Sequence, residues 1–480
     1  MRTQKLISIN GPGGFSEVLK IAFPLILSTS AFTLQLFFDR VLLMWYDRDA
    51  MSGALMGGLT NFVVFSFFLG TISYANTFVS QYDGANRPER IGPAVWQALY
   101  FCAVAGCVMF LFSFFAKTIT GIMDHAESIR INEIKYFRIL ALGATPGFIN
   151  AALSSFYTGR GKTTVVMWIN ILRTAVNILL DYVLIFGKFG FPELGITGAA
   201  IATVSSGAMA SAIYIGLFMS RKNQRKYRTA KYKFETELFK RLMKFGLPSG
   251  TQFMLDILGF TFFVALIGKI NEVAMAATTM ASQINSLAFM PMIGIGIATS
   301  TLVGRALGKN NPALAQKSTW SAGILTFGYM MSIAACYVLL PGVFMYAFKA
   351  RSDPTQFEAI RPLVEKLLVF IAFYCVFDTG NIIFAAALKG AGDTRFVMMV
   401  SVVLNWLVMV IPTWLAVNFL NGMNRLYVAW GWLATYVCAL SIIFLFRFIG
   451  GKWKNMRVIE KAPAVPETLP AMPTVETEGA

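Results

Sequence analysis

The chain has 480 residues, of which 56% are hydrophobic and only 14% are charged, and its mean hydropathy is +0.62. About a quarter of the residues in a soluble domain are charged, so this composition excludes an ordinary soluble protein. It indicates an all-α polytopic membrane protein, because apolar stretches of ~20 residues cross ~30 Å of hydrocarbon and must satisfy their backbone polar groups internally, as helices.

Twelve transmembrane helices are predicted, six in each half of the chain. Their ranges are 17–45, 55–81, 91–116, 132–157, 163–187, 195–219, 241–268, 277–304, 317–346, 362–388, 395–419 and 425–449. We expect an N-terminal lobe over 14–220, a basic cytoplasmic linker over 221–240 and a C-terminal lobe over 241–450. Residues 451–480 are expected to be a disordered cytoplasmic tail, since the part from Lys461 onward is rich in Pro, Glu, Thr and Ala and has little apolar surface to bury.

The formal net charge of +17 encodes orientation rather than nucleic-acid binding. If the N-terminus is cytoplasmic, the even-numbered loops and both tails hold most of the 41 Lys and Arg residues, as the positive-inside rule requires. The densest basic stretch, 221–244, is expected to meet the anionic lipids of the inner leaflet. Arg40, Arg138 and Arg173 fall at or within the predicted helices.

Cysteine and histidine usage argues against metal and redox chemistry. The five cysteines lie inside apolar stretches without a CxxC pair, and the one histidine, His125, lies in a predicted outer loop. We therefore expect no enzyme activity and no cofactor apart from a coupling ion. A membrane enzyme would need a His, Cys or metal-ligand cluster beside its acids, and the sequence offers none.

The two halves of the chain are repeats. Residues 80–96 align with 304–320 without a gap, and Gly84, Pro88 and Trp96 recur as Gly308, Pro312 and Trp320. Each copy holds an even number of spans, so both copies enter the membrane from the same side. This pattern predicts a parallel repeat with a pseudo-two-fold axis along the membrane normal, as found in some transporters. A cleft between the two lobes is the natural place for cargo.

Four acidic residues lie inside predicted spans, two in each half: Asp39, Asp181, Asp256 and Asp378. A charge at mid-bilayer costs about 2.5–3.5 kcal/mol, so such residues usually face an aqueous cavity and carry function. For each acid there are two alternatives to a functional role. The acid either forms a purely structural hydrogen bond, or it lies at a helix end because the predicted boundary of the span is misplaced. Single acids in each lobe do not form a ring of charge along one pore, which argues against a channel.

Each acid is preceded at four residues by a polar side chain on the same helix face. These side chains are Gln35, Asn177, Gln252 and Tyr374, and Asn381 follows Asp378 on the same face. They are able to hydrogen-bond the carboxyl group or to share a bound cation with it. Oxygen ligands from Asp256, Tyr374 and Asp378 would suit Na⁺, whereas a lone carboxyl in an apolar site would suit H⁺.

Two arginines lie close to the acids of the first half. Arg173, Asn177 and Asp181 form one polar stripe at four-residue spacing, and two interpretations remain open. Arg173 either neutralises Asp181 in an internal ion pair or contacts an anionic group on the cargo. Arg40 follows Asp39 directly, and adjacent helical residues do not face each other.

Several segments, in chain order, resemble the multidrug and toxic compound extrusion (MATE) transporters across nearly all of residues 15–450. They are PLILSTSAFTLQLFFD from Pro24, NILLDYVLIFGKFGFPELGITGAAIAT from Asn177, the GLP helix at 246–256, FMPMIGIGIATSTLVGRALGKNN from Phe289 and YCVFDTGN from Tyr374. The resemblance implies a two-lobe antiporter that rocks between inward and outward openings. Uptake of Na⁺ or H⁺ would drive export of organic small molecules, whether drug-like compounds or metabolites.

The resemblance also assigns roles to the acids. It implies a proton-coupling site in the N-terminal lobe at Asp39, Asn177 and Asp181, beside Gln35, and a cation site in the C-terminal lobe at Asp256, Tyr374 and Asp378, beside Gln252 and Asn381. Many members have Glu where this chain has Asp256, which is one methylene shorter.

A flippase for a lipid-linked saccharide is the alternative function within the wider superfamily. It would need a lateral groove and a strongly basic cavity, to which this sequence contributes only Arg40 and Arg173. In either case the expected partners are an organic small molecule and the lipid bilayer, without nucleic acid. We expect a monomer in the plasma membrane, in a bacterium the inner membrane, with both termini cytoplasmic.

Overall fold

The computed structural model describes residues 9–121, 126–349 and 354–460, and in this part of the chain it is all-helical. His125 lies outside the described residues. The N-terminal lobe consists of α1 (Phe15–Tyr46), α2 (Arg48–Ser73), α3 (Ala75–Gly84), α4 (Ile91–Phe114), α5 (Ala116–Thr120), α6 (Glu127–Leu142), α7 (Ala144–Thr158), α8 (Thr163–Phe186) and α9 (Ile196–Phe218). The short helix α10 (Arg221–Tyr227) lies in the linker.

The C-terminal lobe repeats this arrangement. Its helices are α11 (Thr236–Gly268), α12 (Glu272–Gly308), α13 (Pro312–Leu339), α14 (Pro341–Lys349), α15 (Pro354–Ala391), α16 (Thr394–Leu404), α17 (Ile411–Phe419) and α18 (Asn424–Ile449). A π-helical segment, Asn405–Val410, joins α16 to α17. Within the described residues, eleven helical stretches are long and apolar enough to span a membrane, and the pair α6–α7, bent by 46°, makes a twelfth. The predicted twelve-span, all-α fold is confirmed.

Several helices begin earlier than their hydropathy predicts. Helix α11 starts at Thr236, inside the stretch assigned to the linker, and α12 starts at Glu272, where the Asn271 side chain accepts a hydrogen bond from the N–H of Ala274 at 2.7 Å. These helices continue into the polar region beyond the hydrocarbon. Their ends are therefore marked by capping residues and not by the apolar residues from which the spans were predicted.

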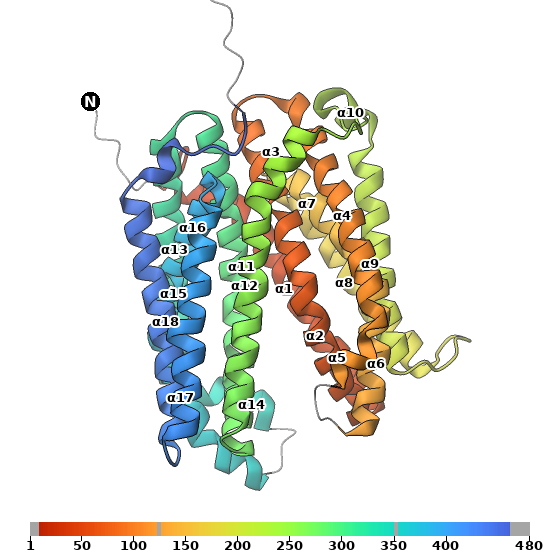
Figure 1. Ribbon diagram of the computed structural model, residues 1–480, viewed down its shortest axis with the longest axis vertical. Coiled ribbons are helices and arrows are strands. Elements are labelled where there is room, and N and C mark those ends of the chain that lie inside the picture. The colour runs from red at the N-terminus through yellow and green to blue at the C-terminus, as the bar shows by residue number, and fades with distance from the viewer. Residues whose placement is uncertain (1–8, 122–125, 350–353, 461–480) are drawn as a thin grey trace, which may run out of the picture.

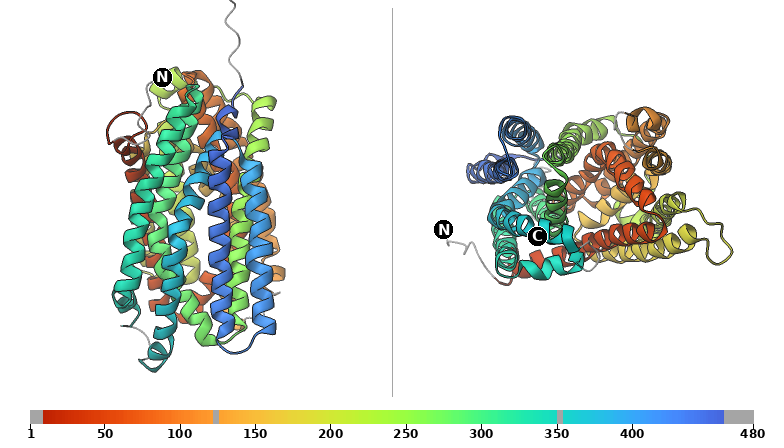
Figure 2. Two further views of the ribbon diagram at one scale, coloured as in Figure 1. Left: turned by 90° about the vertical axis from the view of Figure 1, so that its left-hand side faces the viewer. Right: turned by 90° about the horizontal axis from the view of Figure 1, so that it is seen from below.

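The two lobes stand side by side, each with its own hydrophobic core. In Figure 1 the N-terminal lobe runs from red to yellow and the C-terminal lobe from green to blue, and the view from below in Figure 2 separates the same two groups. Residues 9 and 460 lie at the same end of the bundle, which we call the termini end. The helices of the two lobes diverge toward the opposite end (Figure 1).

Glycines bring the lobes together in two reciprocal contacts. A Cβ added to Gly84 on α3 would collide with the carbonyl oxygen of Arg305, and one added to Gly308 on α12 would collide with that of Gln81. Arg305 is the repeat equivalent of Gln81, so each contact mirrors the other. This reciprocity confirms the parallel pseudo-two-fold repeat.

The second reciprocal contact lies deeper in the bundle. A Cβ added to Gly70 on α2 would lie 2.9 Å from Cα of Gly250 on α11, and one added to Gly294 on α12 would lie 2.8 Å from the backbone nitrogen of Ile26 on α1. In the repeat, Gly294 is the equivalent of Gly70, and Gly250 is the equivalent of Ile26. At these glycines the lobes meet backbone to backbone, without large side chains between them.

Polar contacts between the lobes reinforce the same half of the bundle. The Tyr74 hydroxyl donates to the carbonyl of Lys389 at 2.8 Å, and the Gln81 amide donates to the carbonyl of Gly390 at 3.0 Å. Arg305 pairs with Asp83 at 3.0 Å. Among the described residues, every interlobe hydrogen bond lies between the middle of the bundle and the termini end, so this end is closed.

The segment after α18 returns to the N-terminal lobe. Trp453 is fully buried and stacks on Phe448 with ring centroids 4.8 Å apart. Val458 is also fully buried, and its N–H donates to Oε1 of Gln81 at 2.9 Å. The predicted disordered tail over 451–480 is therefore wrong for residues 451–460, because Trp453 and Val458 supply the apolar surface that orders the segment. Residues 461–480 lie outside the described part of the chain.

Glu460 anchors this segment to the other lobe. It accepts a hydrogen bond from the Tyr82 hydroxyl at 2.6 Å and pairs with Arg87 at 2.8 Å and Arg90 at 3.3 Å. Burial raises the pKa of Glu460, but the Tyr82 hydrogen bond and the two arginine charges outweigh it, so the pKa lies below its usual 4.5. This carboxylate ties the end of the C-terminal lobe to α3 and α4.

We predict that Gly84→Leu opens the termini end, because its side chain would meet the backbone of Arg305 rather than a movable side chain. The measurement is the distance between spin labels at Lys222 and Lys309 in a cysteine-free background. Gly216→Leu, which faces open space on α9, is the control. We expect longer distances in Gly84→Leu alone. Identical distance distributions in the two variants would contradict this close contact.

We also predict that Glu460→Gln loosens residues 452–460 by about 1 kcal/mol at neutral pH, or roughly fivefold in the opening equilibrium. Because the pKa of Glu460 is lowered in the fold, its contribution is present above about pH 4.5 and is lost as the pH falls through the folded-state value. Hydrogen exchange of this peptide measures the effect, with Glu89→Gln as control. Equal exchange in both variants at neutral pH would refute the anchoring role.

Candidate functional site

The four polar residues predicted in the N-terminal lobe form one cluster. Gln35 and Asp39 project from α1, and Asn177 and Asp181 project from α8, against which α1 packs. Asp39 is 5% exposed, and Asn177 and Asp181 are fully buried. The four-residue spacing on each helix therefore places two carboxyl groups and two amides at one interface.

Asn177 lies between the two acids. Its amide nitrogen donates to Oδ1 of Asp39 at 3.0 Å and to Oδ2 of Asp181 at 3.2 Å, while its oxygen accepts from the backbone N–H of Thr203 at 3.3 Å. This orientation is the one that satisfies the hydrogen-bond network. One amide thus fixes both carboxyl groups and is itself fixed by α9.

The two carboxyl groups of Asp39 and Asp181 also interact with each other. Two adjacent carboxylates in an apolar site repel each other, and neither is well solvated. Oδ1 of Asp181 is buried and has no hydrogen-bond partner within the described structure. The arrangement is therefore suited to holding a proton on this pair.

Neither arginine forms an ion pair with these acids in the described residues. Arg173 and Arg40 attract Asp39 only over a longer distance, and Arg40 is exposed. The internal ion pair between Arg173 and Asp181, one of the two interpretations above, is not formed in this conformation.

Two further residues complete the cluster. Tyr136 on α6 is buried and interacts electrostatically with both Asp39 and Asp181, and Thr203 supplies the backbone N–H for Asn177. The sequence had no sign that Thr203 takes part in this cluster, since its contribution comes from the backbone. The sequence also had no signal for Tyr136, since a tyrosine in an apolar span is ordinarily a packing residue.

In the C-terminal lobe, Asp256 on α11 has a different surrounding. The Gln252 amide donates to Oδ2 of Asp256 at 3.2 Å and to the Ser401 hydroxyl at 3.1 Å. Tyr436 on α18 and Lys389 on α15 interact electrostatically with the carboxyl group. The predicted span 362–388 ends just before Lys389, which lies in the last turn of α15 and brings a positive charge toward Asp256.

Asp378 belongs to a second set of contacts. The Asn381 amide donates to its Oδ1 at 2.9 Å, and Asp378 is 5% exposed. Tyr374 instead accepts a hydrogen bond from the Asn285 amide at 3.2 Å. Among the described residues, no hydrogen bond links Asp256 to Tyr374 or Asp378. The structure confirms the pairs Gln252–Asp256 and Asp378–Asn381 as neighbours, but it does not bring all three predicted cation ligands into direct contact.

The π-helical segment places one more polar residue beside Asp256. The Asn405 amide donates to the carbonyl of Leu255 at 3.5 Å, and the side chain fills the space that a Cβ on Gly259 would need. π-Bulges occur frequently at functional sites. Asn405 was missed because no local sequence signal marks a π-bulge.

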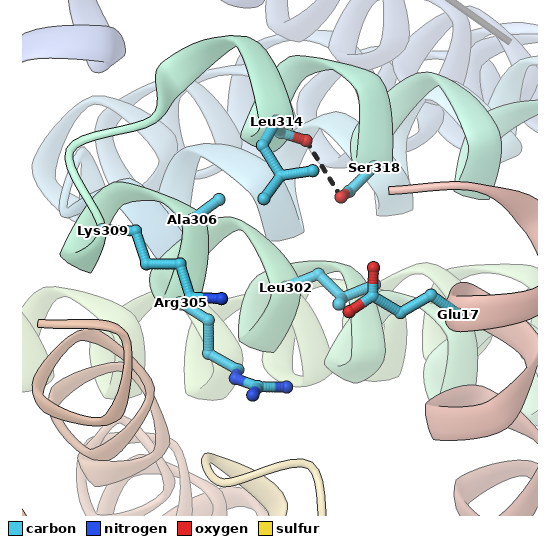
Figure 3. Close-up of a pocket in the computed structure, with 7 residues that line it drawn as sticks. All are labelled: Glu17, Leu302, Arg305, Ala306, Lys309, Leu314 and Ser318. Carbon is cyan, nitrogen blue, oxygen red and sulfur yellow. Dashed lines mark hydrogen bonds between the residues drawn. The ribbon is translucent and has the colours of Figure 1, made fainter. Parts of the chain in front are cut away.

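Two cavities of different size lie in the described structure. The smaller cavity lies at the termini end and has a volume of about 20 Å³. It is lined by Glu17, Leu302, Arg305, Ala306, Lys309, Leu314 and Ser318 (Figure 3). Glu17 accepts a hydrogen bond from Gly13, and Arg305 pairs with Asp83. This crevice is too small for an organic molecule and is part of the closed end.

The larger cavity lies within the N-terminal lobe and has a volume of about 210 Å³. It is lined from α2, α7, α8 and α9 by Leu69, Ser73, Gly147, Asn150, Ala151, Ser154, Asn170, Arg173 and Tyr214. Arg173 therefore faces a cavity, two helical turns along α8 from Asp181.

Comparisons with known proteins agree with this architecture. The family model described as MatE matches residues 24–183 and 248–415, one segment in each lobe. The chain is 29% identical over 451 residues to "Probable multidrug resistance protein NorM" of Pseudomonas putida, covering 93% of this chain and 96% of that protein. It is 27% identical over 440 residues to the protein of the same name in Bradyrhizobium diazoefficiens, covering 91% and 93%.

A solved structure shares the fold. A MOP superfamily transporter from Pyrococcus furiosus superposes with a TM-score of 0.84 at 18% sequence identity, covering 95% of this chain and 100% of that chain.

We predict that Asn177→Leu destabilises the protein by about 1–3 kcal/mol at neutral pH, because it leaves two buried carboxyl groups without their shared donor. The loss should shrink in acid, where both carboxyl groups are protonated and are able to hydrogen-bond each other. Thermal unfolding of the purified protein at two pH values measures this, with the exposed Asn418→Leu as control. A pH-independent loss would contradict the proposed role of the amide.

Proposed function

The chain belongs to the MatE family of membrane transporters, and we propose that it exports organic molecules across a bacterial inner membrane in exchange for protons. The names of its relatives support drug-like cargo, since those proteins are described as multidrug resistance proteins. The distribution of Lys and Arg supports a cytoplasmic position for the termini end. Each chain holds both lobes and its own cavity, so we propose that a monomer is the working unit.

The observation that carries the proton assignment is the Asp39–Asn177–Asp181 cluster. Two carboxyl groups share one donor in an apolar site, so ionising both is costly. Protonation of one acid removes the repulsion and leaves a hydroxyl donor for the other. The pair is therefore able to take up a proton from the outer side and release it when its exposure to water changes.

The interlobe contacts support alternating access. The lobes touch through glycines and short polar bonds at the termini end and diverge at the other end, so with the termini in the cytoplasm this conformation is open outward. A rocking motion of the lobes would open the termini end and close the opposite end, which would expose the cavity to the cytoplasm. Binding of a proton or of cargo biases this equilibrium only by its difference in affinity for the two states.

The C-terminal lobe offers the alternative coupling site, for Na⁺. Asp378, Asn381 and Tyr374 present oxygen atoms, and Oδ1 of Asp256 is buried without a partner in the described structure. However, Lys389 already supplies a positive charge near Asp256, which weakens cation binding there. We therefore assign coupling to the N-terminal pair. A flippase is not favoured, since the larger cavity is lined by one arginine only.

The test is dye efflux from proteoliposomes under an imposed H⁺ or Na⁺ gradient. We expect Asp39→Asn and Asp181→Asn to lower H⁺-driven efflux more than tenfold, since an amide cannot exchange a proton. Asp49→Asn, at the start of α2 and outside both clusters of acids, is the control. Normal H⁺-driven efflux in both N-lobe variants would refute the proposal, and efflux that needs Na⁺ and fails in Asp256→Asn and Asp378→Asn would move coupling to the C-terminal lobe.

A further inference from the structure

We propose that Arg173 and Tyr214 form a subsite in the larger cavity that binds a carboxylate group of the cargo. This inference rests on the proposed function and specifies its substrate class: organic molecules that carry a carboxylate, whether zwitterions or anions. The subsite lies between α8 and α9 of the N-terminal lobe, separate from the proton-holding cluster.

Arg173 carries a positive charge without a partner in the described structure. Arg173 makes no hydrogen bond or ion pair with any other described residue, and its Nε atom is buried without a partner. Its attraction to Asp39 acts only over a longer distance. A half-buried guanidinium whose Nε lacks a partner and a counter-charge is costly, so a ligand that supplies one negative charge would be favoured.

A phenol lies in the same cavity as the guanidinium. Tyr214 lines the same cavity, is 1% exposed, and its hydroxyl is buried without a partner. Buried polar groups in proteins nearly always have a hydrogen-bond partner. Tyr214 therefore offers a second free donor beside the guanidinium, and an acceptor placed in the cavity would satisfy both groups together.

Most of the other polar side chains of the lining already form hydrogen bonds. Asn150 donates to the carbonyl of Gly207 at 3.0 Å and accepts from Ser211 at 3.0 Å, and Asn170 donates to the Ser28 hydroxyl at 2.6 Å. Ser154 donates to the carbonyl of Ala151 at 3.1 Å. Among the lining residues, the buried polar atoms without a partner in the described structure are Nε of Arg173 and the hydroxyl of Tyr214.

The charge of the lining selects the ligand. The lining includes one arginine and no acidic residue, so a purely cationic group would be repelled. Arginine binds a carboxylate through two parallel hydrogen bonds. One guanidinium and one phenol match a single negative charge, whereas a phosphate dianion would keep a second charge without a partner. The volume of about 210 Å³ is large enough to hold the carboxylate end of an organic molecule.

The test compares two matched dyes, a carboxyl rhodamine and its methyl ester, which differ only in the carboxylate. Binding to the purified full-length protein is measured by fluorescence anisotropy, without any gradient. We expect the wild type to favour the acid and Arg173→Gln to lower the acid-to-ester affinity ratio at least tenfold, the range of a charge-assisted hydrogen bond. Arg173→Lys should keep part of the preference, because its ammonium lacks the planar fork.

Two further variants test the contribution of Tyr214 and control for the loss of an arginine outside the cavity. Tyr214→Phe should lower the same ratio about fivefold. Arg40→Gln, which removes an exposed arginine on α1, should leave the ratio at its wild-type value. If Arg173→Gln weakens both dyes equally, or if Arg40→Gln lowers the ratio as much, there is no carboxylate subsite at Arg173.

Efflux of the two dyes from proteoliposomes separates this inference from the proposed function. If the wild type prefers the acid in binding but a proton gradient drives efflux of neither dye, the subsite stands and the antiport proposal fails. If a proton gradient drives efflux of the ester and the acid equally, and Arg173→Gln changes neither, antiport stands and the subsite is refuted.

Discussion

A carboxyl group inside a membrane must find donors within the protein, and this requirement organises both lobes. In the N-terminal lobe one amide, that of Asn177, donates to two acids on two helices, and α9 holds the amide in place. The site thus joins α1, α8 and α9, which are parts of the lobe that have to stay together when the lobes move. The same requirement gives Asp256 a glutamine and Asp378 an asparagine.

The second constraint is backbone contact between the lobes. Gly84 and Gly308, and then Gly70 and Gly294, occupy equivalent places in the two repeats and leave no room for a side chain. Contacts of this kind are close, and at these positions they exclude interlocking side chains. Together with the ion pairs of Glu460 and Arg305 they hold one end of the bundle closed while leaving a surface that is able to separate.

The sequence predicted most of this fold because hydropathy marks spans and the repeat marks their pairing. It also placed Gln35, Asp39, Asn177 and Asp181 on shared helix faces, which the structure brings together. It could not predict the ordered segment ending at Glu460, whose partners lie on the far lobe. Tyr136, Lys389 and Asn405 were missed for a related reason: each reaches its acid through tertiary packing or a π-bulge, which single-helix periodicity does not encode.

The central claim is that Asp39 and Asp181 hold a proton that leaves when the medium becomes alkaline. Infrared difference spectroscopy of the reconstituted protein between mildly acidic and alkaline solution detects that proton directly, through the carbonyl stretch of a protonated carboxyl group. The account predicts a band that disappears in alkali and is altered or absent in Asp39→Asn and Asp181→Asn. A spectrum without such a band, or a band that both variants leave unchanged, would contradict it.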